Sequence, residues 1–466
     1  MRIGTSQRAM ISPGRVPRQR ALGGILILLA LVLFAACEDL EDLVKTPQYS
    51  YVIGDAQNES GGKALYSYLM DNTSGLPELI GSAADYSPDN MKAFAISHSE
   101  KYLYLLTGDD HIITYSVKHD TGFLQAIGSP VKVNPSGNSA GSMYRISVDP
   151  LDQYVYVFAM LSNDNMLNNG KLYDFTLIET YSMDKDTGLL TFKNIEVLDA
   201  HPFSQIVFTQ SGNYAYVASQ IPDYAIVQCD PGPPFVAILS NLPTGVIYIY
   251  EVDRVRGSFR LKDSVSYNPW LVTGDNPITL DPNGKFMYIN ESSGYCVVKS
   301  SSSCPGYTTY DQTGSKVQTY LIDHSTGDLI SSRAGFNNQP EITTWGASHP
   351  SGEFVYHINS YDSRQADYGV CQSYLKVPGY IYSYYVQYGS GEMTLTGITE
   401  AGVGSVSVQV EPSGRFLYMM NSSDIYVYNI DQATGELEVV GEPVSGAQEF
   451  SIPGKAYTFP LSLIGY

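Results

Sequence analysis

Basic residues are scarce in this chain. Its 466 residues include 27 lysines and arginines against 47 aspartates and glutamates, so the formal net charge is −20. A surface that binds nucleic acid needs a basic patch, so this deficit argues against nucleic acid as a partner. Charged residues make up only 16% of the chain and apolar residues 43%, which excludes disorder over most of its length. Tyrosine, with 38 residues, and glycine, with 42, are abundant instead and favour strands and turns.

Acidic residues are absent from the first 36 positions, which contain five arginines. An apolar run from Ala21 to Ala36 follows, and it is shorter than the roughly 20 residues that a permanent membrane helix needs. This order is typical of a bacterial export signal over residues 1–36. Cys37 comes directly after Ala35-Ala36, which resembles a lipoprotein processing site, and the resemblance implies that Cys37 becomes the acylated first residue. A signal without lipidation, or a retained anchor helix, is the alternative.

The charge becomes more negative once residues 1–36 are set aside. The basic residues fall from 27 to 22 against 47 acidic ones, a net charge of −25. Such an acidic body would stay off anionic lipid, so a lipid anchor would supply the membrane affinity. We expect residues 37–47 to form an acidic tether and residues 48–466 to form one domain. The expected location is the cell envelope, facing the periplasm or the cell exterior, with an outer-membrane lipoprotein as the favoured form.

Only four cysteines follow Cys37, at positions 229, 296, 304 and 371. An exported protein meets oxidising conditions, so an even number favours disulfides, with three possible pairings. Cys296 and Cys304 lie eight residues apart in one Ser-rich stretch and are the first candidate pair. Neither a Cys-x-x-Cys spacing nor a nearby histidine accompanies Cys229 or Cys371, which argues against a metal site.

One motif recurs seven times at a fixed spacing. A strand-like segment ends in Tyr, and a Gly stands seven residues later, usually after an Asp. The copies occupy positions 68–75, 115–122, 181–188, 250–257, 320–327, 384–391 and 428–435. Glycine tolerates the positive φ of a tight turn, so each copy predicts two antiparallel strands joined by that turn.

A second motif lies between the copies of the first. It consists of Pro, a small polar residue, Gly and then aromatic-x-Tyr, most clearly at 282–288, 350–356 and 412–418. It predicts another turn between two strands, so each unit has four strands, which we name a to d in chain order. The second motif joins strand a to strand b, and the first joins c to d. Seven such units without a long helical period predict an all-β, seven-bladed β-propeller of four-stranded antiparallel blades.

The first and last repeats are incomplete. The first unit has only Tyr49–Ile53 before strand c, and residues 450–457 are a degenerate copy with no c–d pair after them. We therefore expect the C-terminal strand to complete the first blade, which removes two free sheet edges. Two separate β-sandwich domains are the rival architecture, and the unbroken sevenfold phase disfavours them.

These motifs resemble those of the lactonase family, the 6-phosphogluconolactonase-like propellers, and the related YVTN repeats. The resemblance rests on Asp281–Asn290 and on Tyr-x-Ile-Asp-x-x-Thr-Gly-x-Leu at 320–329, and it covers nearly all of residues 48–460. It implies a seven-bladed propeller. Family members that act on lactones carry a His-Pro-His and an Asp-Leu-Gly stretch. Here the corresponding segments are His201-Pro202-Phe203 and Val217–Gln220, without the second His and without Asp-Leu-Gly.

The long insertions all fall between strands b and c. They are residues 160–176, 219–246, 291–316 and 360–380. In a propeller these connections share one face with the d–a loops, which we name the insertion face, and the a–b and c–d turns form the opposite turn face. Propellers bind ligands at the channel mouth on the insertion face, and loops this long are usually functional or disordered. A mere capping role for them is the alternative.

Two of the seven histidines, His111 and His201, belong to the insertion face, and His201 is the better candidate for a general base. Arg145 lies on an inner strand, where it could clamp a carboxylate or phosphate, or form a structural ion pair with Asp275 or Glu341. Aligning the inner strands on their turns places Arg145 at one level with three other residues. We take these three, together with Asp275, as candidate ligand contacts: Gln205, Trp345 and Ser407.

Together these features predict an envelope-anchored module that binds a small ligand or a protein at the insertion face, with no cofactor and no metal. One alternative is a lactone hydrolase that uses His201 and Arg145 at the channel mouth. The other is a structural part of an envelope assembly.

Overall fold

The computed structural model describes the domain over most of its strands and turns. The described residues are 48–55, 63–82, 91–133, 144–161, 175–198, 203–221, 225–227, 236–238, 244–267, 278–293, 314–332, 345–358, 379–401, 407–420, 424–445 and 447–451. They contain strands and turns and no helix, and they belong to one compact unit, Pro47–Tyr466. No helix that is long and apolar enough to cross a membrane occurs in this part of the chain.

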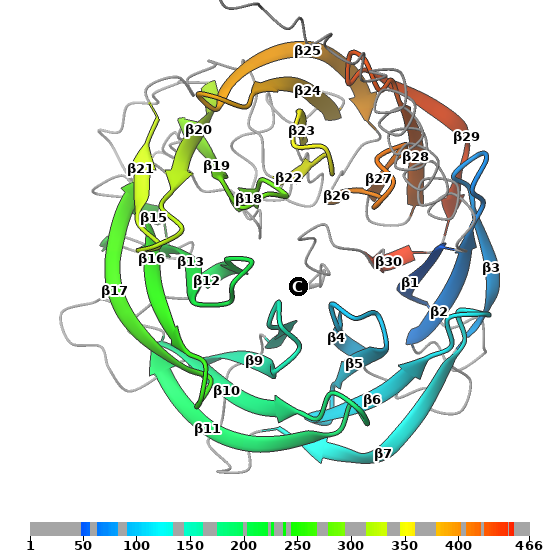
Figure 1. The fold of residues 1–466 in the computed structure, drawn as a ribbon, viewed down its shortest axis with the longest axis vertical. Coiled ribbons are helices and arrows are strands. Elements are labelled where there is room, and N and C mark those ends of the chain that lie inside the picture. The colour runs from blue at the N-terminus through cyan, green and yellow to red at the C-terminus, as the bar shows by residue number, and fades with distance from the viewer. Residues whose placement is uncertain are drawn as a thin grey trace, which may run out of the picture. The chain divides into compact units, whose positions relative to one another are not determined.

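Seven four-stranded antiparallel sheets are arranged as the blades of a ring (Figure 1), so the predicted fold class is confirmed. From the centre outward, the first four blades are β30 (Ala447–Ser451), β1 (Gln48–Asp55), β2 (Lys63–Met70), β3 (Pro77–Ser82); β4 (Met91–Ile96), β5 (Tyr102–Thr107), β6 (His111–Val117), β7 (Leu124–Lys132); β8 (Tyr144–Val148), β9 (Tyr154–Leu161), β10 (Phe175–Met183), β11 (Leu190–Leu198); and β12 (Phe203–Phe208), β13 (Tyr214–Ile221), β16 (Thr244–Asp253), β17 (Ser258–Tyr267).

The remaining three blades repeat the same order. They are β18 (Ile278–Leu280), β19 (Phe286–Ser293), β20 (Gly314–Ile322), β21 (Leu329–Ser331); β22 (Trp345–Ser348), β23 (Phe354–Ile358), β24 (Gly379–Gln387), β25 (Glu392–Ala401); and β26 (Ser407–Val410), β27 (Phe416–Met420), β28 (Asp424–Ile430), β29 (Leu437–Ser445). A short hairpin of β14 (Ala225–Val227) and β15 (Val236–Ile238) is inserted between strands b and c of blade four.

The C-terminal strand closes the ring as expected. β30 pairs antiparallel with β1, with Tyr51 opposite Ser451 and Val52 opposite Phe450. Blade one is therefore built from both ends of the domain, and its inner strand comes from the last described residues. Closure in this way covers the free edge of β1.

The two sequence motifs meet across every blade interface. The seven turn glycines have φ between 68° and 72°. A Cβ added at any of them would lie 2.3–2.8 Å from a ring carbon of the preceding blade, which is closer than real Cβ contacts allow. That ring is the first aromatic of aromatic-x-Tyr, so the glycine of one motif is the seat for the aromatic residue of the other. The pairs are Gly75 with Phe416, Gly122 with Tyr49, Gly188 with Tyr102, Gly257 with Tyr154, Gly327 with Tyr214, Gly391 with Phe286 and Gly435 with Phe354.

The second tyrosine of the motif often reaches the same turn. The hydroxyl of Tyr104 donates to the carbonyl of Gly188 at 3.0 Å, and Tyr216 donates to Gly327 at 2.9 Å. Tyr51 and Tyr418 make the equivalent bonds to Gly122 and Gly75. A buried hydroxyl costs free energy unless it finds a partner, which explains why Tyr recurs there. The high tyrosine and glycine contents thus reflect contacts between blades.

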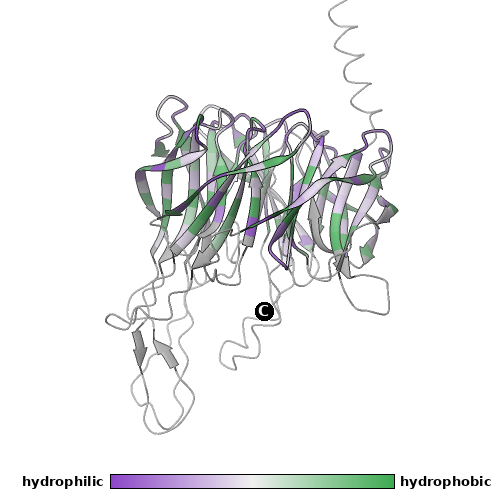
Figure 2. Ribbon diagram, turned by 90° about the horizontal axis from the view of Figure 1, so that it is seen from below, coloured by the Kyte–Doolittle hydropathy of each residue, from purple (hydrophilic) through white to green (hydrophobic). Residues whose placement is uncertain are grey.

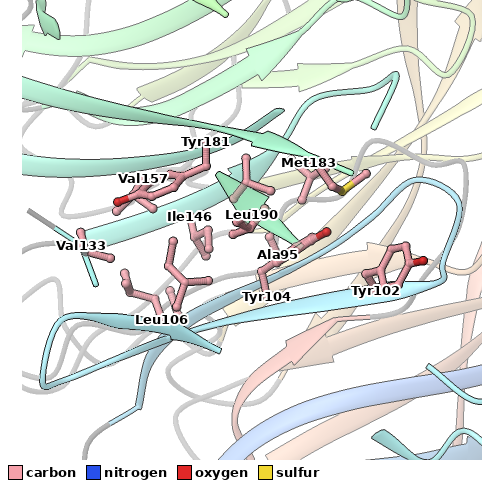
Figure 3. Close-up of a cluster of buried hydrophobic side chains, with 14 of the residues drawn as sticks. Ala95, Tyr102, Tyr104, Leu106, Val133, Ile146, Val157, Tyr181, Met183 and Leu190 are labelled. Carbon is pink, nitrogen blue, oxygen red and sulfur yellow. The ribbon is translucent and has the colours of Figure 1, made fainter. Parts of the chain in front are cut away.

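Apolar side chains fill the spaces between neighbouring sheets. One such cluster (Figure 3) joins blades two and three through Tyr104, Leu106, Ile146, Val157 and Tyr181. The strands alternate apolar and polar positions where one face is wet, and they are apolar throughout where both faces are covered (Figure 2). Burial on both faces accounts for the low charged fraction of the chain.

Candidate functional site

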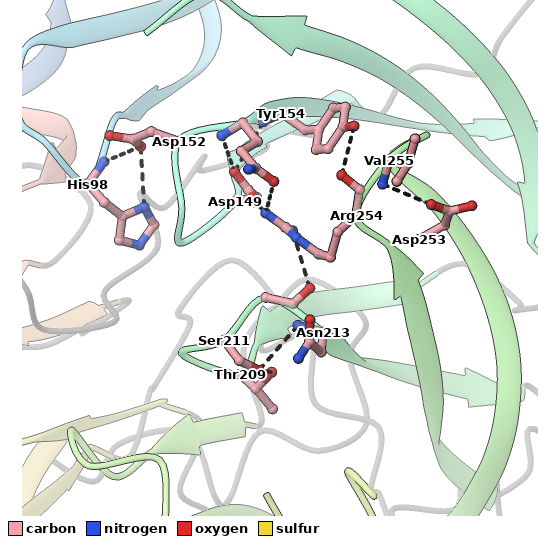
Figure 4. Close-up of polar contacts among 12 residues, drawn as sticks. His98, Asp149, Asp152, Tyr154, Thr209, Ser211, Asn213, Asp253, Arg254 and Val255 are labelled. Carbon is pink, nitrogen blue, oxygen red and sulfur yellow. Dashed lines mark hydrogen bonds and ion pairs between the residues drawn. The ribbon is translucent and has the colours of Figure 1, made fainter. Parts of the chain in front are cut away.

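The turn face is occupied by contacts that join blades. Arg254, from the c–d turn of blade four, forms an ion pair with the fully buried Asp149 on the a–b turn of blade three (Figure 4). The same guanidinium donates to the side-chain oxygen of Gln153 at 2.6 Å and to the carbonyl of Gly212 at 3.2 Å. These groups are consumed by structure, so this face offers little chemistry for a ligand.

A second link on the turn face joins blades two and three. The carboxylate of Asp152 accepts the backbone N–H groups of His98 at 2.7 Å and Ser99 at 2.8 Å. Burial raises the pKa of Asp152, but these hydrogen bonds outweigh it and bring the pKa below its usual range. The backbone of Asp152 itself has φ of 52°. His98 therefore lies on an a–b turn, as predicted, in a structural role.

The long insertions interrupt the same pair of strands in four consecutive blades. They separate β9 from β10, β13 from β16, β19 from β20, and β23 from β24. Each of these pairs is a b–c pair of its blade, so all four insertions leave from the insertion face. The positions of the candidate ligand residues relative to this face can then be taken from the register of the inner strands.

Arg145 and three other candidates occupy one level of the inner strands, as predicted. Arg145, Gln205, Trp345 and Ser407 each lie four residues before the residue whose backbone N–H closes the a–b turn. Arg145 is half-buried and Ser407 is buried. Trp345 begins β22, and its side chain lies outside the described part.

Gln205 has a contact that sequence reasoning did not anticipate. Its side-chain NH₂ donates to the carbonyl of Ile278 at 2.8 Å, and its side-chain oxygen accepts the backbone N–H of the same residue at 2.7 Å. Gln205 thereby links the inner strands of blades four and five. Its role as a ligand contact stays a prediction, and its role as a link between blades is a finding.

A carboxylate–imidazole pair lies on the b–c turn of blade two, on the insertion face. The His111 Nδ1 atom is 2.9 Å from the carbonyl oxygen of Asp109 and 3.2 Å from its Oδ2. Because both oxygens can only accept, Nδ1 carries the proton, and in the neutral ring Nε2 keeps its lone pair. The His111 side chain is 32% exposed, so its ring is accessible from solvent.

The Asp109 carboxylate is itself held in place. The Thr107 hydroxyl donates to it, and the backbone N–H of His111 donates to that hydroxyl at 3.1 Å. The Thr107 hydrogen bond and the nearby His111 hold the pKa of Asp109 below its usual range, although burial acts in the opposite direction. The carboxylate therefore stays charged and orients the imidazole, which is the arrangement of a general base.

Lys92 adds a cation next to this pair. It belongs to the inner strand β4, and its ammonium lies 3.0 Å from the carboxylate of the neighbouring Asp110. Blade two thus presents charges of both signs, along with a possible proton acceptor, where the insertion face meets the inner strands. No group of three or more His, Cys, Asp or Glu able to hold a metal ion occurs among the described residues.

Several predicted functional residues lie outside the described residues. His201 and Asp275 are among them, as is Cys37. The four further cysteines, 229, 296, 304 and 371, lie there as well, so the disulfide pairing stays a prediction.

Comparison with solved structures gives the fold independently. A protein assigned as a 6-phosphogluconolactonase from Bacteroides uniformis aligns with TM-score 0.56 and 14% identity, covering 88% of this chain and 100% of its own. A periplasmic gluconolactonase from Pseudomonas aeruginosa aligns with TM-score 0.55 and 14% identity, covering 88% and 99%. A second Bacteroides protein, from Bacteroides fragilis, assigned as a 6-phosphogluconolactonase, has TM-score 0.56 and 13% identity, covering 88% and 98%. No protein-family model and no curated protein sequence matches the chain. The chain therefore has the seven-bladed propeller fold of these lactonase-like proteins.

Proposed function

We propose that this protein is a cell-envelope propeller, anchored through a lipid on Cys37, that binds a small polar ligand at its insertion face. The observation that carries the proposal is the division of labour between the faces. The turn face is filled by contacts between blades, while the four long insertions and the Asp109–His111 pair belong to the insertion face. A ligand site needs accessible polar groups on a rigid scaffold, and only the insertion face combines these among the described residues.

Arg145 indicates the ligand chemistry. A guanidinium binds a carboxylate through two parallel hydrogen bonds, so a half-buried arginine on an inner strand suits an organic acid. The solved structures of similar fold bear the names of lactonases, whose reactions link sugar lactones to sugar acids. We therefore infer that sugar acids or their lactones are the first ligands to test.

Calorimetric titration of the full-length protein in detergent with gluconate and 6-phosphogluconate tests the binding. Arg145→Met is expected to weaken binding at least about tenfold, the order of one lost charged hydrogen-bond pair. Arg256→Ala is the matched control, because this arginine is 80% exposed on the turn face. Equal affinities for Arg145→Met and the wild type would refute Arg145 as the anchor.

Lactone hydrolysis is the second candidate function, and the Asp109–His111 pair favours it. Water would attack the lactone carbonyl while an imidazole removes its proton. The bond between that carbonyl carbon and the ring oxygen would then break, and the ring oxygen would take the proton to give a hydroxy acid. Either His111 or His201 would be the base, with Arg145 holding the substrate.

Acid release from a panel of sugar lactones separates binding from hydrolysis. Turnover above the spontaneous rate that is lost in His111→Ala or His201→Ala would establish the hydrolase and identify its base. His119→Ala is the control, because His119 lies on a c–d turn of the opposite face. Binding without turnover would leave the ligand-binding module as the function.

A further inference from the structure

The chain enters the propeller from the turn face. β1 is strand b of blade one, and its first residue, Gln48, is opposite Met70, the last residue of β2. Met70 leads directly into the c–d turn in which the N–H of Gly75 bonds the carbonyl of Asp71 at 2.7 Å. The segment that precedes Gln48 therefore starts among the turns, opposite the long insertions.

The tether that joins Cys37 to this point is short. Eleven residue steps separate Cys37 from Gln48. Fully extended they span at most about 36–40 Å, and a flexible chain of this length averages about 17–20 Å. To reach the plane of the insertion face, the tether would have to cross two outer strands, about 10 Å, and then the height of an eight-residue strand, about 26 Å. That path uses the whole extended length, with nothing left for the insertions themselves.

The turn face carries fixed negative charge. Five of the seven c–d turns begin with an aspartate whose carboxylate accepts backbone N–H groups two and three residues on, and we name these residues the acidic rim: Asp71, Asp184, Asp253, Asp323 and Asp431. These hydrogen bonds lower the pKa of each rim carboxyl, so the rim stays charged in mildly acidic surroundings. An anionic lipid surface would repel the rim over about a Debye length.

We propose that the turn face lies toward the lipid bilayer, held a short distance off it by the acidic rim, and that the insertion face points away from the membrane. This inference rests on the lipid anchor of the proposed function. Its consequence is that the ligand site opens to the aqueous compartment and not to the bilayer.

Energy transfer to the membrane tests the orientation. The full-length lipidated protein is reconstituted in vesicles of phosphatidylethanolamine and phosphatidylglycerol that contain an acceptor lipid, and a fluorescent amino acid is placed at one exposed position at a time. Thr73 and Val255 report on the turn face in blades one and four, and Lys132, at the end of β7, reports on the insertion face. We expect transfer at Thr73 and at Val255 to exceed that at Lys132 by about twofold or more, since a blade is about 25 Å high.

The possible outcomes separate the orientation from the anchor. Strongest transfer at Lys132 would overturn the orientation, as would a Val255 value as low as that of Lys132, which means an edge-on propeller. Wild-type protein that fails to associate with vesicles, or a Cys37→Ser variant that associates equally well, would overturn the anchor and the orientation with it. Replacing Asp184, Asp253 and Asp323 by Asn keeps the turn-capping oxygen and removes the charge, so transfer at Thr73 should rise. Unchanged transfer would refute the stand-off role of the rim.

Discussion

Gly435 offers a direct test of the contact between the two motifs. Its φ is 72°, and a Cβ there would lie 2.4 Å from a ring carbon of Phe354 in blade six. Replacement by Ala therefore incurs two costs. The left-handed backbone conformation costs about 1–2 kcal/mol for a residue with a Cβ, and the overlap with the ring costs about 1–3 kcal/mol. We expect Gly435→Ala to lower the free energy of unfolding by about 2–5 kcal/mol.

A double-mutant cycle separates the two costs. In a Phe354→Ala background the ring is gone, so Gly435→Ala should cost only the backbone term of about 1–2 kcal/mol. Gly389→Ala is the control, because no atom lies within 4 Å of its Cβ position, and it should change stability by less than about 0.5 kcal/mol. Urea unfolding followed by circular dichroism gives each value. Equal costs of Gly435→Ala with and without the Phe354 ring would refute the packing argument.

Three further predictions follow from other contacts. Arg254→Met leaves the buried carboxylate of Asp149 without its ion-pair partner and should cost about 3–5 kcal/mol in urea unfolding, whereas a loss under 1 kcal/mol would contradict this. Burial lowers the pKa of His357 to about 3, so the stability that the neutral ring contributes is present above its ordinary pKa and is lost as pH falls from about 6.5 towards 3. Between pH 7 and pH 4 the wild type should lose about 3 kcal/mol more than His357→Phe, and parallel pH profiles would refute this. Deleting residues 447–466 removes β30 and uncovers β1, so limited proteolysis should cleave blade one sooner than in the full chain.

The fold was predictable because its signals are local and repeated. A Tyr-to-Gly spacing and a Pro-Gly turn each define a hairpin, and seven copies in phase define the ring. The partners across blades were not predictable in the same way. Nothing local in the sequence pairs Gly435 with Phe354, since those residues meet only after the blades assemble.

The candidate site was predicted less completely. Register from the turns placed Arg145 and Ser407 at the right level, but the link from Gln205 to Ile278 depends on how far apart two inner strands stand. The sequence placed His111 on the insertion face, and the run Asp109-Asp110-His111 at a short turn was the available signal for its pairing with Asp109. Recognising that pair required the turn geometry, which sets which side chains converge.

Closure of blade one by β30 also sets the order of events during synthesis and export. β1 is made first and its inner neighbour last, with about 400 residues between them, so the ring cannot close before the end of the chain has emerged. Contacts of such large sequence separation form late and slow folding. Until then β1 presents an unpaired edge, a feature that chaperones and proteases can recognise in an unfinished chain. A truncated product would keep that edge exposed, so the closing strand makes completion of the chain a condition for a sealed fold.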